Sequence, residues 1–183
     1  MYILGDIGNS ETKIFLVNSN YKILKNIILP TKKINYKNLK SNFKKLTSNF
    51  NVIKKLLFCT VVPKSYKIIK KFLSKKTKVR CYEIKDLNLK SLININVNFK
   101  QVGSDRLTNA ISDINKKNNF IILDFGTATT FDVVIKKNYR GGVIAPGIKI
   151  SLNTLSDKAT LIPKLNLKKI KKVIGIDTNS AVR

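Results

Sequence analysis

The sequence predicts an α/β protein built from two related halves. One observation is a repeated turn, Asp6-Ile7-Gly8-Asn9-Ser10 near the start and Asp124-Phe125-Gly126-Thr127-Ala128-Thr129 in the second half. Each turn joins two strand-like apolar runs, so each is expected to form a hairpin. A second observation is that short apolar runs alternate with segments of helical spacing in both halves. The 183 residues, 43% of them hydrophobic, suffice for one large domain or two small ones with a core.

Three strands are expected to open the first half. Their connections are short, which favours an antiparallel arrangement. Apolar positions at helical spacing then predict two helices, and two further short apolar runs predict strands. The predicted strands cover residues 2–5, 12–17, 21–29, 56–59 and 79–84, and the helices cover 36–50 and the segment after Pro63.

The second half is expected to begin in the same way. Ser104 is a suitable N-cap for a helix, and strands are expected at 120–123, 130–135 and 142–145. A helix should follow Pro146-Gly147, the basic stretch 164–172 should be a solvated loop or helix face, and a last helix should begin near Thr178.

The order β-β-β-α-β-α-β of the first half is that of the ribonuclease H-like architecture, which actin and the sugar kinases use twice. The second half has only the first part of that order, so by symmetry at least two strands are expected to be missing. We therefore predict a duplicated ribonuclease H-like (actin-like ATPase) fold with a truncated second half. The halves are expected to span residues 1–102 and 103–183.

The charge of the chain is strongly positive, with 36 basic against 10 acidic residues and a net charge of +26. Only four of the basic residues are Arg, the residue that nucleic-acid readers favour. The lysines are spread among Asn and Ile, whose codons are also A/T-rich, so we attribute the excess to genome composition. We expect no nucleic-acid partner, but an attraction for anionic substrates such as ATP.

The chain is expected to be cytoplasmic. No apolar run approaches the ~20 residues of a membrane span, and the first residues resemble a strand more than a signal peptide. Cys59 and Cys81 lie in strand-like runs, as buried reduced thiols would. The chain has no His, which excludes Ser-His-Asp, Cys-His and His-zinc chemistry, so a general base must be Asp, Glu or Lys.

Four segments could carry chemistry. Backbone N–H groups and hydroxyls at the tips of the two turns suit phosphate, although ordinary hairpin turns would have the same composition. In Gly103-Ser104-Asp105-Arg106, the acid could act as a general base and the Arg could bind a carboxylate through two hydrogen bonds; a capped helix with a solvent-facing Arg is the alternative. Gly141 to Gly147 is predicted to be a strand framed by glycines, which permit close approach of a ligand or another chain; a strand with a tight turn at each end is the alternative. Walker-type and Rossmann-type glycine motifs are absent from the sequence.

Taken together, these motifs resemble type III pantothenate kinase, over the whole chain and in the order and spacing of that family. The motifs that carry the resemblance are Asp6 to Ser10, Gly103 to Leu107 with Asn109-Ala110, Asp124 to Asp132 and Gly141 to Ile148, with weaker matches at Val61-Val62-Pro63 and Gly175 to Thr178.

The resemblance implies ATP-dependent phosphorylation of pantothenate, the first step of coenzyme A biosynthesis, by a homodimer. It implies that Asp105 accepts the proton of the pantothenate hydroxyl and that Asp6 holds Mg²⁺ through water. It places a monovalent cation, K⁺ or NH₄⁺, on Asp124. The implied ATP-binding residues are Asp6, Ile7, Gly8, Asn9, Ser10, Glu11, Thr12, Lys13 and Thr127. The implied pantothenate-binding residues are Gly103, Ser104, Asp105, Arg106, whose guanidinium would meet the carboxylate, and Thr178.

The chain departs from the family pattern at two positions, Asn96, where the family often has Tyr, and Phe99, where it often has Pro. A weaker contact with pantothenate is expected there. Family members are also longer, and continue for several dozen residues beyond the position that matches residue 183. Two alternatives therefore stay open: a truncated, non-catalytic relative acting as a regulator or surviving as a relic, and an actin-like kinase for another small hydroxy acid.

Overall fold

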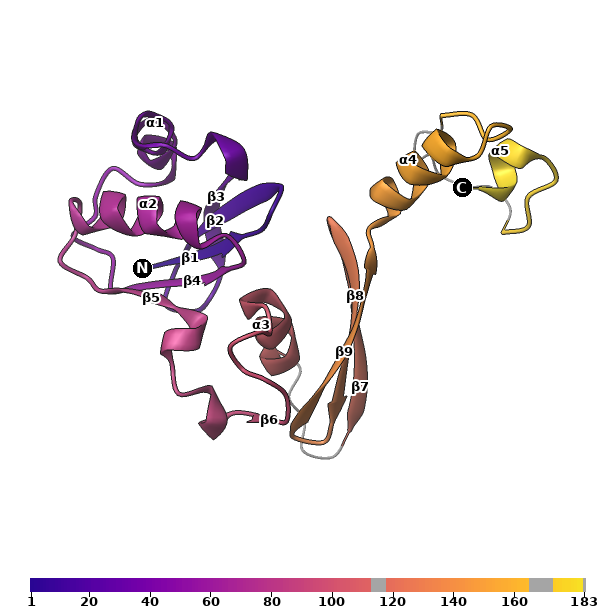
Figure 1. The fold of residues 1–183 in the computed structure, drawn as a ribbon. Coiled ribbons are helices and arrows are strands. Elements are labelled where there is room, and N and C mark those ends of the chain that lie inside the picture. The colour runs from indigo at the N-terminus through magenta and orange to yellow at the C-terminus, as the bar shows by residue number, and fades with distance from the viewer. Residues whose placement is uncertain (113–117, 165–172, 183) are drawn as a thin grey trace.

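The computed structural model describes residues 1–112, 118–164 and 173–182, which form two β-sheets with helices around them (Figure 1). Sheet A has the strand order β3-β2-β1-β4-β5, in which β1, β2 and β3 are antiparallel and β4 and β5 run parallel to β1. Its strands are β1 (Tyr2–Ile7), β2 (Glu11–Val17), β3 (Ile23–Pro30), β4 (Lys55–Thr60) and β5 (Cys81–Glu83).

Two helices, α1 (Tyr36–Leu46) and α2 (Pro63–Ser74), provide the apolar layer over sheet A. Leu39, Phe43 and Leu46 recur along one face of α1, and the side chain of Asn35 accepts a hydrogen bond from the N–H of Asn38 at its start. The helix ends before the predicted residue 50, because Thr47 is already extended.

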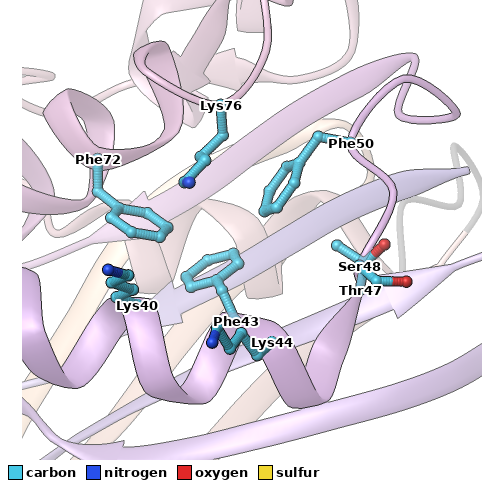
Figure 2. A pocket seen from close by; sticks show the side chains of 8 residues that line it. All are labelled: Lys40, Phe43, Lys44, Thr47, Ser48, Phe50, Phe72 and Lys76. Atoms are coloured by element: carbon cyan, nitrogen blue, oxygen red, sulfur yellow. The ribbon is translucent and has the colours of Figure 1, made fainter.

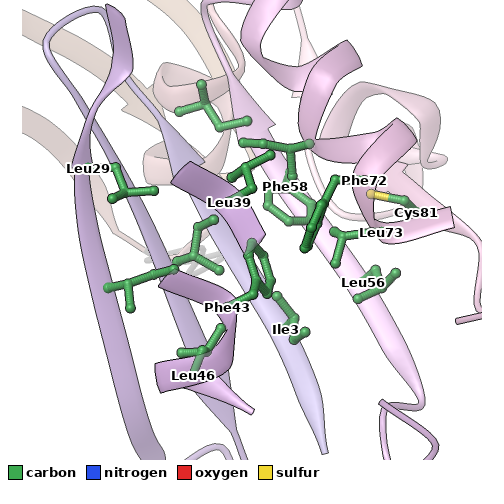
Figure 3. Close-up of a cluster of buried hydrophobic side chains, with 14 of the residues drawn as sticks. Ile3, Leu29, Leu39, Phe43, Leu46, Leu56, Phe58, Phe72, Leu73 and Cys81 are labelled. Carbon is green, nitrogen blue, oxygen red and sulfur yellow. The ribbon is translucent and has the colours of Figure 1, made fainter. Parts of the chain in front are cut away.

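The core of this first half lies between the two helices and the central strands (Figure 3). Phe43 and Phe72 contact each other with ring centroids 5.0 Å apart, and Phe58 of β4 is fully buried. Gly5 is the register partner of Phe58, and a Cβ at Gly5 would overlap its ring, so this strand position must lack a side chain. The predicted order β-β-β-α-β-α-β is confirmed.

Sheet B has the order β6-β9-β8-β7, and its last three strands form an antiparallel meander. They are β7 (Asn119–Phe125), β8 (Ala128–Ile135) and β9 (Asn138–Pro146); β6 (Asn94–Ile95) is parallel to β9. Helix α3 (Ser104–Ser112) lies against β8 and buries Leu107 and Ala110 with Val134 and Tyr139. Short 3₁₀ helices cover Thr31–Lys33, Ile84–Asp86 and Leu89–Ser91.

The meander and its helix match the predicted start of the second half, whereas the two-residue β6 was not predicted. Sheet B and its core already include residues from Leu89 onward, and the division at residue 102 stays a prediction. Within the described chain, β7 pairs only with β8, whereas its counterpart β1 is paired on both sides.

The face of sheet B opposite α3 is apolar and exposed. Ile121, Leu123 and Phe125 of β7 and Val143 of β9 are 49–67% exposed. Helices α4 (Ile148–Lys158) and α5 (Thr178–Ala181) lie beyond the edge of sheet B where β8 begins and β9 ends, and they leave this face open (Figure 1). The helix predicted near Thr178 is confirmed, and most of the predicted basic stretch, 165–172, lies outside the described residues. None of the described helices has the length and apolar character needed to cross a membrane.

Candidate active site

The two repeated turns are hairpins, and their tips meet. Gly8 N–H donates to the carbonyl of Glu11 (3.0 Å) in the β1–β2 hairpin, and Gly126 N–H donates to the carbonyl of Ala128 (2.9 Å) in the β7–β8 hairpin. The hydroxyls of Ser10 and Thr127 lie 2.8 Å apart across the gap between the hairpins. The two turns are similar in sequence but far apart along the chain, and the fold places their tips in contact.

Thr31, which directly follows β3, stabilises the first hairpin through hydrogen bonds. Its hydroxyl donates to the carbonyl of Gly8 (2.7 Å) and lies 2.9 Å from the hydroxyl of Thr12, and its N–H donates to the carbonyl of Ser10 (2.9 Å). Thr12 and Thr31 are buried. Thr12, which was predicted to bind ATP, therefore supports the loop. The backbone N–H groups of Asn9 and Ser10, in contrast, have no partner among the described residues and are free to bind an anion.

Asp6 lies inside β1, in one row with Lys13 of β2 and Cys59 of β4. The Cys59 thiol donates to Asp6 Oδ1 (3.3 Å). Burial and the nearby Asp6 carboxylate raise the pKa of the Cys59 thiol far above its ordinary value. The thiol therefore stays protonated and acts as a donor to Asp6.

Asp105 stands in the first turn of α3. Its Oδ1 accepts a hydrogen bond from the N–H of Arg106 (2.8 Å), and a Cβ on Gly103 would overlap this same oxygen. The glycine of the motif thus leaves room for the carboxylate. Ser104 is buried and is the first residue of the helix, so the predicted cap position falls one residue earlier, on Gly103.

Asp105 lies within the electrostatic reach of the carboxylates of Asp124 and Asp6. Burial raises the pKa of Asp105, the N–H of Arg106 lowers it, and the charges of Asp124 and Asp6 raise it further. Asp124 accepts a hydrogen bond from Asn109 Nδ2 of α3 (3.0 Å), a contact that ties β7 to the helix. Asn109 belongs to one of the motifs in the sequence, but the motif predicted no role for this side chain.

The described residues contain no group of three or more side chains that could hold a metal ion together. Mg²⁺ keeps several waters and commonly needs only one or two carboxylates beside substrate phosphates. Asp6 of β1 and Asp124 of β7 each place a carboxylate in a strand that leads into one of the two hairpins.

Arg106 forms a buried network with two residues that sequence reasoning did not single out. Its Nε donates to Asp132 Oδ1 (2.8 Å), and its Nη2 lies 2.6 Å from the same oxygen. The hydroxyl of Tyr139 also donates to Asp132 Oδ1 (2.6 Å). A signal was present in the sequence: an Asp within the apolar strand run Phe131-Asp132-Val133 must have a partner if it is buried.

Two other regions lie apart from this site. Thr178 is on α5, which Figure 1 shows well away from α3, so its part in substrate binding stays a prediction. A groove of about 420 Å³ lies between α1 and α2, and none of the predicted site residues lines it (Figure 2). It is lined by Lys40, Phe43, Lys44, Thr47, Ser48, Phe50, Phe72 and Lys76.

Comparison with known sequences agrees with this arrangement of motifs. The family model described as type III pantothenate kinase matches residues 2–183. A type III pantothenate kinase from Pelagibacter ubique (strain HTCC1062) is 61% identical over 183 residues, covering 100% of this chain and 74% of the relative. One from Sulfurihydrogenibium sp. (strain YO3AOP1) is 35% identical over 193 residues, covering 100% of this chain and 75% of the relative.

Solved structures with little sequence identity share the fold. One is described as a conserved Baf family transcriptional activator from Campylobacter jejuni (TM-score 0.53, 18% identity, 98% of this chain and 71% of that chain). Another is described as a 2-dehydro-3-deoxygalactonokinase from Sinorhizobium meliloti (TM-score 0.54, 7% identity, 94% of this chain and 64% of that chain). The predicted actin-like kinase fold is confirmed.

Proposed function

Because the chain belongs to the type III pantothenate kinase family, we propose that it transfers the γ-phosphoryl group of ATP to the hydroxyl group of pantothenate. This reaction is the first step of coenzyme A biosynthesis. The observation that carries the proposal is the meeting of the Ser10 and Thr127 hairpin tips beside a carboxylate, Asp105, whose pKa responds to charges on both hairpins.

Asp105 is the general base in this proposal. The substrate oxygen forms a bond to the γ-phosphorus, the bond from that phosphorus to the β–γ bridging oxygen breaks, and the hydroxyl proton passes to Asp105. The raised pKa of Asp105 suits it to hold that proton. The products are phosphopantothenate and ADP.

The two hairpin tips hold the phosphates. The free N–H groups of Asn9 and Ser10 and the hydroxyl of Thr127 are the donors, while Lys13, in the row of Asp6, supplies positive charge. Asp6 would hold Mg²⁺ through water, and Asp124, which accepts a hydrogen bond from Asn109, would hold K⁺ or NH₄⁺. When bound, these cations neutralise the phosphate charge that grows in phosphoryl transfer.

Pantothenate lies against the start of α3 in this proposal. Gly103, Ser104 and Asp105 contact its hydroxyl end, and Arg106 meets its carboxylate. We also propose that the protein works as a homodimer.

The test is turnover by the purified chain with Mg²⁺, K⁺, ATP and pantothenate, followed by ADP release and by mass spectrometry of the product. We expect phosphopantothenate from the wild type, and none from Asp105→Asn, which should still bind ATP. Asp157→Asn, an exposed acid on α4, is the matched control and should retain full activity. Turnover that survives Asp105→Asn would remove the base assignment. Phosphorylation of another hydroxy acid in place of pantothenate would redirect the proposal.

A further inference from the structure

We infer that Asp132 and Tyr139 are positioning residues for the recognition of the substrate carboxylate. They hold the Arg106 guanidinium through Nε and Nη2 and leave its Nη1 group to bind the carboxylate of pantothenate. This inference rests on the proposed function, and it deepens that function by naming what orients the specificity-determining arginine.

A single oxygen gathers the contacts that fix Arg106. Oδ1 of Asp132 receives hydrogen bonds from Arg106 Nε (2.8 Å) and from the Tyr139 hydroxyl (2.6 Å), and Arg106 Nη2 lies 2.6 Å away as an ion pair. Oδ2 of Asp132 accepts from the hydroxyl of Thr130 (3.4 Å). Both carboxylate oxygens thus have partners on β8, β9 or α3.

The network is buried, so it is not an incidental surface pair. Asp132 and Tyr139 are 0% exposed, and the side chain of Arg106 is 13% exposed. A buried carboxylate is strongly unfavourable unless it is paired and hydrogen-bonded. Burial and the neighbouring Asp132 raise the pKa of the Tyr139 hydroxyl, which therefore remains a donor to the carboxylate.

The way Arg106 meets Asp132 determines what it can still bind. A guanidinium is planar and carries five N–H donors, which form two forked edges. Nε and Nη2 face Asp132, so Nη1, for which the described residues provide no hydrogen-bond partner, remains for a second carboxylate. Nη2 is buried and its N–H groups make no aligned hydrogen bond within the described chain. Its partner is the Asp132 carboxylate, 2.6 Å away, and Nη2 is enclosed by protein, so a ligand must bind the guanidinium at Nη1.

The glycine pair on β9 belongs to the same arrangement. Gly142 is the register partner of Asp132, and a Cβ there would overlap the carbonyl oxygen of Phe131 and stand 3.0 Å from Arg106 Nη2. The close approach that Gly142 permits is therefore that of the next strand and of the guanidinium. Glycine at this position leaves room for the buried Nη2 group of Arg106.

A purely structural link between α3 and β8 would use the same contacts, so the test must separate stability from recognition. We would measure binding of pantothenate and of pantothenol by calorimetry, because pantothenol carries an alcohol in place of the carboxylate. The variants are Tyr139→Phe and Asp132→Asn. Tyr66→Phe is the matched control, since it also removes a buried tyrosine hydroxyl, one that donates to the carbonyl of Cys81 in the other core.

We expect Tyr139→Phe to weaken pantothenate binding about threefold and Asp132→Asn to weaken it about tenfold or more, the scale of losing hydrogen bonds to a charged group. Pantothenol and ATP binding should stay the same in Tyr139→Phe, and Tyr66→Phe should change neither ligand. If Asp132→Asn fails to fold, the binding measurements on Tyr139→Phe alone test the positioning role.

Equal losses for pantothenate and pantothenol, or no loss for either, would overturn the positioning role while leaving the proposed function intact. A wild-type chain that binds no pantothenate would overturn the proposed function and this inference together.

Discussion

The hydroxyls of Ser10 and Thr127 lie 2.8 Å apart although 117 residues separate them along the chain. One belongs to the hairpin of sheet A and the other to the hairpin of sheet B, so this contact joins the two halves at the proposed phosphate site. Both residues are exposed, which leaves them accessible to a ligand.

The contact predicts that the two hydroxyls act together on ATP. Ser10→Ala and Thr127→Ala should each raise KM for ATP and leave KM for pantothenate unchanged. The double variant should lose less than the sum of the single losses, by about 0.5–1.5 kcal/mol, because each single change already breaks the shared hydrogen bond. Steady-state kinetics of the four proteins measure this coupling, and strictly additive losses would contradict it.

Gly103 should affect catalysis by leaving room for the Asp105 carboxylate. A Cβ at this position overlaps Asp105 Oδ1, so Gly103→Ala must displace the carboxylate from the place that the N–H of Arg106 gives it. A misplacement of this kind can cost on the order of 100-fold in kcat. The control is the Asp105→Asn background, in which adding Gly103→Ala should have no further effect on the residual rate. A further loss there would mean that Gly103 acts on the substrate directly.

Charge on Asp105 should destabilise the fold. Burial and the charges of Asp124 and Asp6 outweigh the N–H of Arg106 and raise the pKa of this carboxyl above its value in the unfolded chain. Between those two pKa values the folded chain holds more protons than the unfolded one, so this group makes stability fall as the pH rises through that window. Below the window the group has no effect on stability, and above it the loss is complete.

Asp105→Asn removes this penalty. In metal-free buffer the variant should therefore gain thermal stability over the wild type as the pH rises through the window, and the gain should then level off. Thermal unfolding followed by circular dichroism over a pH series measures the gain, with Asp157→Asn as the exposed control. A difference between the proteins that does not vary with pH would contradict the raised pKa.

Cys59 should support Asp6 as a donor. Cys59→Ala removes the 3.3 Å contact to Oδ1 and should raise the Mg²⁺ concentration needed for half-maximal turnover, whereas Cys59→Ser, which keeps a donor, should largely restore it. Because the pKa of this thiol is raised, alkylation by iodoacetamide at neutral pH should be slow in the folded chain and fast in guanidinium chloride. Rapid alkylation of the native protein would contradict the protonated, half-buried thiol.

The sequence was sufficient to predict the elements and the two hairpins, because strand alternation and turn residues are local signals. Helix α1 stops at Leu46 and not at residue 50, since the extended Thr47 ends it, and β6 is too short to leave a pattern. The partner of Arg106 could not be predicted, because Asp132 meets it only through the register of β8 with β9 and the packing of α3 on β8. In the same way, the bracing of the first hairpin by Thr31 depends on where β3 ends.

The open apolar face of sheet B should make the 183-residue chain self-associate. Leu123 of β7, Phe131 of β8 and Val143 of β9 are register neighbours, and Leu123 is 49% and Val143 62% exposed. A contiguous exposed patch of this kind is a typical site of association. We expect species larger than a monomer in sizing chromatography with light scattering.

Leu123→Lys with Val143→Lys should shift the chain toward monomer, because neither side chain supports the core. The same two changes made on the exposed Leu24 and Ile28 of β3 serve as the control. A wild-type chain that is monomeric at high concentration would show that this face does not drive association.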